Sequence, residues 1–311
     1  MFFPLNIIGY VLEFFYLRLL NDQEVITVSE STKKDLMRYG FKKDRIHIIS
    51  EGIQCEPLAQ LPAIHHAKYD TPTILSLGAV RAMKRADHIV TAFNILKSTS
   101  SHSHKNLSHL HDNSCHSRAG ENPEYEEATS CHSRAGGNPG NKDVVKNQQK
   151  TCQSIHKNNN LKYKQQIKNA KLIIAGDIHD PYAQKVLHNV AKSPYKNDIT
   201  VLGRVSTEKK WELMQKSHLI AVTSIKEGWG LIVTEAASQG TPAVVYDVDG
   251  LRDAVEWGDA GYMTKDNTPK ALANEMIQAL QDEDKYERIR QYAWHKSQKL
   301  TFEKSYKDFF L

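Results

Sequence analysis

The chain has 311 residues, enough for one large domain or two domains of ordinary size with buried cores. Its composition, 40% hydrophobic and 25% charged residues, is typical of a soluble globular protein, and its formal net charge of +5 is spread along the chain and does not argue for a nucleic-acid partner. The four cysteines, at positions 55, 115, 131 and 152, follow no zinc-finger spacing, so we expect a reduced, cytoplasmic protein.

The first 20 residues, MFFPLNIIGYVLEFFYLRLL, are strongly apolar but include Glu13 and Arg18. A charge near the middle of a membrane span is costly, and the segment lacks the basic start and the small-residue cleavage site of a signal peptide. We therefore expect a helix that packs in a core or an interface. Peripheral contact with a membrane is the alternative. A helix that spans the membrane is the third interpretation, and the two charges disfavour it.

Short apolar runs and amphipathic stretches alternate along the rest of the chain. Residues 24–31 and 45–50 are predicted strands on either side of a short helix at 32–40. From residue 73 the alternation is regular, with strands at 73–78, 171–177, 199–203, 219–224 and 242–247 and helices at 86–97, 182–192, 207–217, 231–240 and 251–258. Continuously apolar strands that are each followed by an amphipathic helix indicate a parallel sheet covered on both faces, which is a doubly wound α/β domain. The tail from residue 270 has a helical period.

The alternation stops between residues 98 and 165, in a segment rich in Asn, His, Ser and Lys. It contains a near-perfect repeat, SCHSRAGENP at 114–123 and SCHSRAGGNP at 130–139. The repeated Cys-His pairs could be zinc ligands, but adjacent residues on one extended strand point apart, and the copied stretch includes positions with no ligand role. We expect a disordered, low-complexity surface insertion instead.

A glycine-rich turn, EGWG, follows the predicted strand at 219–224. Open α/β sheets bind ligands at the carboxyl ends of their strands, and the free amides at the start of the next helix favour an anion such as a diphosphate. Glu227 and Glu235 would repel that anion unless they face sugar hydroxyls, since a carboxylate accepts hydrogen bonds from a vicinal diol. The pair therefore predicts sugar recognition beside phosphate recognition. The alternative is that Glu227 caps the helix and Glu235 is solvated on its surface.

Six segments, in order, resemble glycosyltransferase family 4, the retaining nucleotide-sugar transferases of the GT-B fold. The most specific is EGWGLIVTEAASQGTPAVV, which is similar to the family's donor motif of Glu-Gly-aromatic-Gly-Leu, a second Glu followed by Ala, and then Gly-Thr-Pro. The others are VITVSESTKKDL, RIHIISEGI, LSLGAVRAMKRADHIVTAF, VLGRVSTEKKWELMQKSHL and GLRDAVEWGDAGYM. Apart from the insertion, the resemblance covers nearly all of the chain.

The resemblance implies a GT-B type α/β fold in which residues 71–97 and 166–290 form one Rossmann-like, doubly wound donor domain. Residues 1–60 are similar to the end of the family's N-terminal acceptor domain plus a linker, and residues 98–165 are the insertion. Residues 291–311 are similar to the C-terminal helices that pack toward the acceptor domain. We expect this chain to carry only a remnant of that acceptor domain.

The resemblance also assigns donor binding to residues in the matching motifs. Glu227 would hold hexose hydroxyls and Lys84 would neutralise the leaving diphosphate, so these two are the candidate catalytic residues. Glu235 would bind the nucleotide ribose, and Arg204 lies where the family's base-contacting loop runs. The turn beside them comprises Gly228, Trp229, Gly230 and Leu231. The alternative for Trp229 is simple packing in the cleft wall.

One position departs from the family pattern. The family has Gly-Arg where this chain has Gly78-Ala79, so one of the two customary diphosphate cations is absent from its position. Arg81 is near enough in the sequence to substitute. The alternative for Lys84 and Arg85 is an ordinary solvated helix start.

The implied reaction is transfer of a hexose from a nucleotide diphosphate sugar to an acceptor hydroxyl with anomeric retention, with no cofactor and no obligatory metal. The implied partners are the nucleotide sugar and a glycan or lipid acceptor, and residues 1–20 offer a contact with the inner face of the cell membrane or with a partner chain. The alternative is a catalytically inactive donor-binding fragment, either decayed or one half of a split enzyme. A third interpretation is a non-transferase enzyme of the same fold, such as a nucleotide-sugar epimerase.

Overall fold

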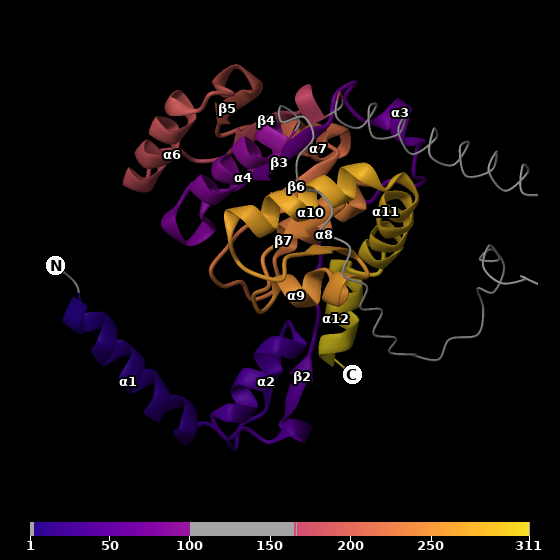
Figure 1. Ribbon diagram of the computed structural model, residues 1–311. Coiled ribbons are helices and arrows are strands. Elements are labelled where there is room, and N and C mark those ends of the chain that lie inside the picture. The colour runs from indigo at the N-terminus through magenta and orange to yellow at the C-terminus, as the bar shows by residue number, and fades with distance from the viewer. Residues whose placement is uncertain (1–2, 100–164, 166, 311) are drawn as a thin grey trace, which may run out of the picture.

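The computed structural model describes residues 3–99, 165 and 167–310. Its main body is an all-parallel sheet of six strands in the order β5-β4-β3-β6-β7-β8 (Figure 1). The strands are β3 (Thr73–Leu77), β4 (Lys171–Ala175), β5 (Ile199–Gly203), β6 (Leu219–Val222), β7 (Ala243–Val245) and β8 (Gly261–Met263). The expected α/β class and doubly wound parallel sheet are confirmed.

Helices cover both faces of this sheet. Neighbouring residues of β3 point to opposite faces, so Ile74 belongs to one core and Leu75 to the other. The core around Ile74 is closed by α4 (Ala86–Thr99), α6 (Pro181–Lys192) and α10 (Pro269–Gln281). The core around Leu75 is closed by α7 (Thr207–Lys216), α8 (Leu231–Ser238) and α9 (Leu251–Ala254). Single turns of 3-10 helix occur at η1 (Lys43–Arg45), η2 (Ala82–Lys84), η3 (Lys196–Asp198) and η4 (Glu256–Gly258).

One strand and one helix of the sheet domain differ from the sequence-based expectation. Strand β8 was not predicted, because its three residues are too few to show a period. The helix expected at 251–258 ends at Ala254, because Glu256 and Trp257 have φ angles of +46° and +58°, which no right-handed helix accommodates.

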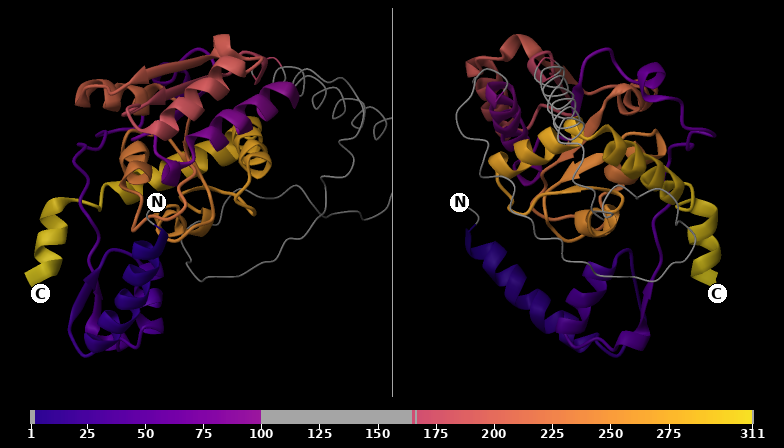
Figure 2. Two further views of the ribbon diagram at one scale, coloured as in Figure 1. Left: turned by 90° about the vertical axis from the view of Figure 1, so that its left-hand side faces the viewer. Right: turned by 45° about the vertical axis from the view of Figure 1, so that its right-hand side comes forward.

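The N-terminal elements form a separate small unit. Strands β1 (Val25–Thr27) and β2 (Ile46–Ile48) pair in parallel, and α2 (Glu30–Arg38) connects them. Figure 2 shows these indigo elements set apart from the sheet, with α12 (Phe302–Phe310) extending beside them. The linker after β2 meets the chain before α12, since the amide of Ile53 donates to Leu300 O at 3.1 Å. Three predicted domain boundaries stay predictions: the end of the acceptor remnant and linker at residue 60, the start of the donor domain at residue 71, and the start of the C-terminal helices at residue 291.

Helix α1 (Phe3–Leu19) leads away from this unit. The side chains of Leu12, Phe15, Tyr16 and Leu19 are 60% or more exposed, so the expected core packing of this segment is wrong for the described part of the helix. The interface alternative stays a prediction. Within the described residues, no helix combines the length and the apolar character that a membrane crossing requires.

The C-terminal helices tie the linker to the sheet domain. Helix α3 (Ile64–Ala67) lies in the linker, and α11 (Glu283–Ser297) packs against α8. The guanidinium of Arg290 in α11 is 1% exposed and donates to Gly240 O at 2.9 Å and to Pro62 O at 2.8 Å. One buried cation therefore holds the linker, α11 and the C-terminal end of α8 together.

The chain leaves the described structure after α4 and returns before β4. The expected disorder of residues 98–165 and the Cys-His zinc alternative therefore lie almost entirely outside the described residues. The two ends are close together, because the ammonium of Lys97 in α4 donates to Ala170 O at 3.1 Å.

Candidate functional site

The predicted site lies where the strand order reverses, between β3 and β6. From this point the chain builds outward through β4 and β5 on one side and through β7 and β8 on the other. Ligands in open α/β sheets bind in the crevice outside the carboxyl ends of the strands at such a reversal. The loops at residues 78–85 and 223–230 follow these two strands, so both predicted motifs meet at the expected edge.

Lys84 and Glu227 are in direct contact at this edge. The ammonium of Lys84 pairs with Oε1 of Glu227, and the hydroxyl of Ser224 donates to the same oxygen at 2.6 Å. The Lys84 side chain is 36% exposed and that of Glu227 is 15% exposed, so the pair borders solvent. Glu227 does not cap the helix, because the residue at the N-terminal boundary of α8 is Gly230. Ser224 was missed in the sequence, where a single serine carries no distinguishing signal.

The turn between Glu227 and α8 lies directly against the start of α9, and a glycine on each side makes this close approach possible. Gly230 has a φ of +92°, and a Cβ there would meet Leu251 Cδ2 at 2.7 Å. Gly250 has a φ of +79°, and a Cβ there would lie 2.3 Å from the backbone oxygen of Glu227. The turn leads directly into Leu231, where the first amides of a helix have no intrahelical acceptor. The positive end of the α8 dipole thus lies next to the Lys84–Glu227 pair.

Glu235 lies one turn further along α8 and is buried. Its residue exposure is 7%, and Lys210 of α7 contacts both carboxylate oxygens, at 2.8 and 2.7 Å. The alternative of a solvated Glu235 is therefore wrong. Each of the two glutamates has its own lysine, which explains how carboxylates are accommodated beside a helix start whose amides favour anions. Lys210 was missed because pairing between two helices is not visible in one sequence.

Arg81 and Arg204 belong to a neighbouring cluster around Asp177, which follows β4. Arg204 approaches Asp177 at 3.4 Å and is 82% exposed in its side chain. The pKa of Asp177 is lowered, first by the hydrogen bond from the amide of His179 and further by the charges of Arg204 and Arg81. The two arginines, which follow β3 and β5, thus share Asp177 as a charge partner. Asp177 was not among the predicted site residues.

Close backbone approach explains the glycines after β3 and β4. Gly78 has a φ of +133° and is exposed, and a Cβ added to Gly176 would lie 1.8 Å from Gly78 O. Only glycine fits at position 176, so the two loops are in van der Waals contact at the candidate site.

Trp229 packs along α8. Its indole N–H donates to Thr234 Oγ1 at 2.9 Å, and its ring borders a small cavity shared with Asp253 and Ala254. This geometry favours the role of a wall residue over that of a ligand-stacking residue. Gly228 completes the turn and faces the N-terminal unit, since a Cβ there would lie 3.8 Å from Val28.

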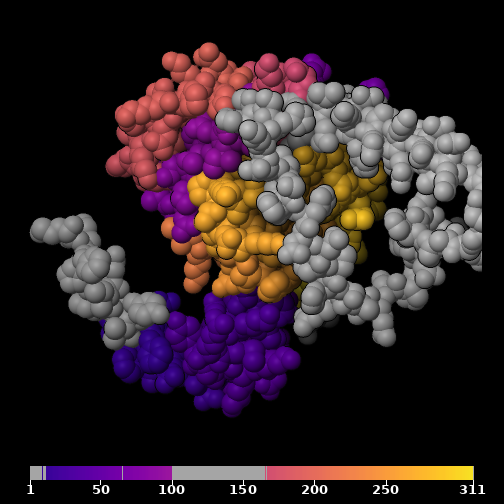
Figure 3. Space-filling view, in the orientation of Figure 1, coloured from indigo at the N-terminus to yellow at the C-terminus, as the bar shows by residue number. Residues whose placement is uncertain are grey.

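A second contact joins the N-terminal unit to the sheet domain near this turn. The amide of Ser31 at the start of α2 donates to Oδ2 of the buried Asp253 in α9 at 2.9 Å. Figure 3 shows the indigo and purple N-terminal surface adjoining the orange surface of the sheet domain. The candidate site therefore borders both units.

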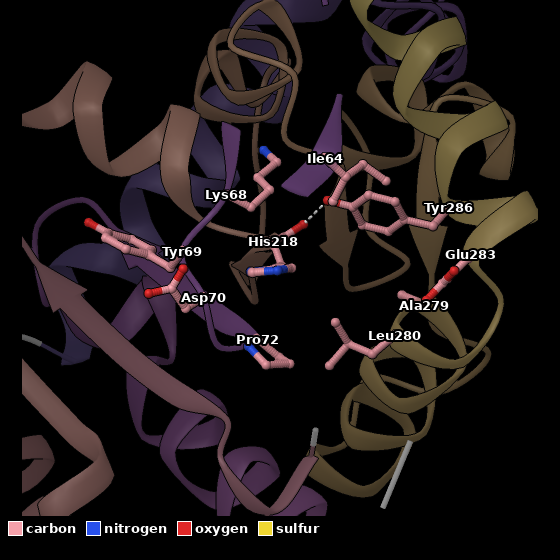
Figure 4. Close-up of a pocket in the computed structure, with 10 residues that line it drawn as sticks. All are labelled: Ile64, Lys68, Tyr69, Asp70, Pro72, His218, Ala279, Leu280, Glu283 and Tyr286. Atoms are coloured by element: carbon pink, nitrogen blue, oxygen red, sulfur yellow. Dashed lines mark hydrogen bonds between the residues drawn. The ribbon is translucent and has the colours of Figure 1, made fainter. Parts of the chain in front are cut away.

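A cavity of about 560 Å³ lies at the opposite edge of the sheet, at the amino ends of β3 and β6 (Figure 4). It contains none of the predicted site residues, and its buried polar groups contact the protein itself. The ammonium of Lys68 bonds Gln215 O, Gly240 O and Thr241 Oγ1. His218 Nδ1 accepts from the amide of Thr73, and burial together with the charge of Lys68 lowers the pKa of His218 to about 4. We therefore assign the chemistry to the carboxyl edge.

In the described part of the chain, no group of three or more His, Cys, Asp or Glu side chains is arranged to hold a metal ion.

Comparison with known proteins identifies the family. The family described as "Glycosyl transferases group 1" matches residues 139–296, a range that includes Glu227 and Glu235. N-acetyl-alpha-D-glucosaminyl L-malate synthase of Bacillus anthracis is 30% identical over 138 residues, which are 42% of this chain and 35% of that protein.

Solved structures have the same fold over nearly the whole chain. A glycosyltransferase from Rickettsia africae superposes with a TM-score of 0.61 at 16% identity, covering 95% of this chain and 65% of that one. The Anabaena protein HepE, solved with UDP and glucose, has a TM-score of 0.56 at 15% identity, covering 92% of this chain and 62% of that one. The chain thus spans less than two thirds of the length of either structure, at 65% and 62%. Because the family match extends over half of the sequence, the chain belongs to the glycosyl transferases group 1 family.

Proposed function

We propose that the chain binds a nucleotide diphosphate sugar at the carboxyl edge of its sheet and transfers the hexose to an acceptor hydroxyl with retention of anomeric configuration. The observation that carries the proposal is the contact between Lys84 and Glu227 at the β3–β6 reversal. It brings a diphosphate-binding group and a hydroxyl-binding group together from motifs on two different strands.

Donor binding divides between the two charge pairs. The diphosphate oxygens bind Lys84 and the free amides at the start of α8, which together replace the charge that a metal ion supplies elsewhere. Glu227, released from Lys84 by the diphosphate, accepts hydrogen bonds from hexose hydroxyls. Glu235 accepts bonds from the ribose diol, while Arg81 and Arg204 face the nucleotide from the loops after β3 and β5. In this proposal no metal takes part.

In the transfer step the bond between the anomeric carbon and the diphosphate oxygen breaks, and a bond to the acceptor oxygen forms on the same face. The proton of the acceptor hydroxyl passes to the leaving diphosphate. Negative charge develops on the leaving diphosphate, where the Lys84 ammonium and the α8 amides stabilise it. Both groups are held in place before the reaction, so little reorganisation is required.

The proposed acceptor is a glycan or a lipid. The exposed apolar side chains of α1 offer a peripheral contact with a membrane at its inner face or with a partner chain. The second candidate function is donor binding without transfer by this chain alone, and it is favoured by the small size of the described N-terminal unit, whose sheet has two strands.

Calorimetric titration of the full chain with UDP-, GDP- and ADP-glucose tests donor binding. UDP-glucose is the first probe because HepE was solved with UDP and glucose. Binding of one donor that is lost in the Glu227→Ala, Lys84→Met double variant supports the proposal, and absence of binding by all three contradicts it. Transfer from the bound radiolabelled donor to a cell-envelope extract separates the two candidates. Turnover abolished by Glu227→Ala supports the transferase, and binding without turnover supports the donor-binding chain.

A further inference from the structure

Thr223 connects the two loops of the candidate site. It directly follows β6 and is 1% exposed. Its hydroxyl lies 2.8 Å from Lys84 O and 3.1 Å from Arg85 O, so its single proton is shared between two consecutive carbonyls. Two residues later, the amide of Ile225 donates to Met83 O at 2.8 Å. The backbone of residues 83–85 is therefore fixed to the loop that carries Glu227.

The conformation of this backbone is an unusual one. Arg85 ends the η2 turn with φ and ψ of +49° and +43°, in the left-handed region where helix ends normally place glycine. A side chain is disfavoured there, so the turn needs support from its surroundings. Thr223 contacts the carbonyl oxygens of Lys84 and Arg85, which lie just before and just after the Cα atom of Arg85. Its hydroxyl therefore spans the bonds whose φ and ψ angles are left-handed.

The direction of the Lys84 side chain depends on this turn. Lys84 is the last residue of η2, immediately before the left-handed residue, and its ammonium reaches the Oε1 atom of Glu227. A turn that relaxed to ordinary right-handed geometry would carry the Lys84 side chain away from Glu227.

We propose that Thr223 is a positioning residue, whose hydroxyl locks the Arg85 turn and so holds the Lys84 ammonium opposite Glu227. The inference rests on the proposed function, because Lys84 is the group through which Thr223 acts on the donor. It adds a residue that neither the donor motif nor a charge pattern reveals.

The variant Thr223→Val removes the hydroxyl and keeps the shape. We expect UDP to bind about tenfold more weakly, because the Lys84 ammonium is no longer aligned for its charged hydrogen bond to the diphosphate. Thr223→Ser retains the hydroxyl and restores binding to within about threefold of the wild type. The matched control is Thr73→Val, because Thr73 is 2% exposed and its hydroxyl donates to Thr71 O at 2.9 Å at the other edge of the sheet. This control leaves UDP binding unchanged.

A double-mutant cycle with Lys84→Met separates positioning from general destabilisation. If Thr223 acts through Lys84, then Thr223→Val has little further effect on UDP affinity once Lys84 is methionine. Effects of the two substitutions that simply multiply would overturn the inference while leaving donor binding intact.

A measurement on the free chain tests the lock even if no nucleotide binds. Hydrogen exchange of the Ile225 amide, which donates to Met83 O, becomes faster in Thr223→Val and not in Thr73→Val. Failure of the wild type to bind any nucleotide sugar contradicts the proposed function. Unchanged exchange at Ile225 contradicts the inference about Thr223.

Discussion

The ammonium of Lys84 and the carboxylate of Glu227 form an ion pair although they are 143 residues apart in the chain. The pair joins the loops that follow two adjacent strands, and it places compensating charge at a turn whose helix amides favour anions. On the proposed function, the diphosphate competes with Glu227 for Lys84, and the carboxylate becomes available to the hexose as the donor binds.

Glu227→Gln distinguishes between the two halves of the donor. We expect UDP to bind at least as tightly as to the wild type, because the competing carboxylate is neutral, whereas UDP-glucose binds about tenfold more weakly through loss of a charged acceptor. Calorimetry with both ligands measures the difference. Glu235→Gln is the matched variant. It lowers the affinity for UDP and for UDP-glucose together, since both ligands carry the ribose. Equal weakening of UDP and UDP-glucose by Glu227→Gln would refute its assignment to the hexose.

The Lys210–Glu235 pair is predicted to stabilise the fold as well as the site. Lys210→Met leaves a carboxylate with a 9% exposed side chain without its cation, and we expect a loss of about 2 kcal/mol in the free energy of unfolding. Urea denaturation at pH 7 measures this loss.

The neighbouring residue of the same helix supplies the control for Lys210. Lys209 pairs with Glu212 on the surface, so Lys209→Met changes the free energy of unfolding by no more than about 0.5 kcal/mol. Equal results for the two lysines would show that burial of Glu235 does not depend on Lys210. Recovery of stability on adding Glu235→Gln to Lys210→Met would identify the unpaired charge as the cause.

Periodicity and motif together predicted much of this architecture, and tertiary contacts account for what they did not predict. The apolar runs at β3, β4 and β6 are unambiguous because both faces of these strands are buried. The donor motif indicated both glutamates, and the segment LSLGAVRAMKRADHIVTAF indicated Lys84. Their partners could not be predicted in this way, because a lysine in α7 or a hydroxyl after β6 looks like any other surface residue until the helices pack.

Two features have no signal in the sequence pattern at all. The left-handed conformation of Arg85 is imposed by contacts from Thr223, since arginine does not favour it. The exposure of the described side chains of α1 also contradicts the apolar composition of the helix, which normally indicates burial.

The free energy of unfolding should fall as the pH is lowered from about 6.5 to about 4, partly because of His218. Burial and Lys68 lower the pKa of His218 in the folded chain to about 4, below its ordinary value of 6.5. The unfolded chain therefore binds more protons in this window, so the stabilisation is complete above pH 6.5 and is lost as the pH approaches 4. At pH 5 the expected loss is about 2 kcal/mol relative to pH 7.5.

Urea denaturation at several pH values measures this slope. His218→Asn keeps an acceptor for the amide of Thr73 but does not titrate, so its slope between pH 7.5 and 5 is smaller than that of the wild type. A residual slope is expected from His88, whose pKa burial also lowers. Identical slopes for the wild type and His218→Asn would mean that His218 is not buried neutral.

Deletion of residues 100–163 should leave the thermal midpoint within about 2 °C of the full chain. Helix α4 and the segment before β4 are already in contact without these residues: Lys97 bonds Ala170 O and pairs with Asp198 at 2.8 Å, and Leu96, Ile167 and Ala170 share one buried core. A short connection can therefore replace the deleted residues, and loop length has only a weak logarithmic effect on stability.

Differential scanning calorimetry of the shortened chain measures the midpoint. Ile167→Ala is the control that shows the assay senses this joint, since Ile167 is 1% exposed and its truncation lowers the midpoint by several degrees. A shortened chain that melted as early as Ile167→Ala would show that residues 100–163 contribute packing of their own.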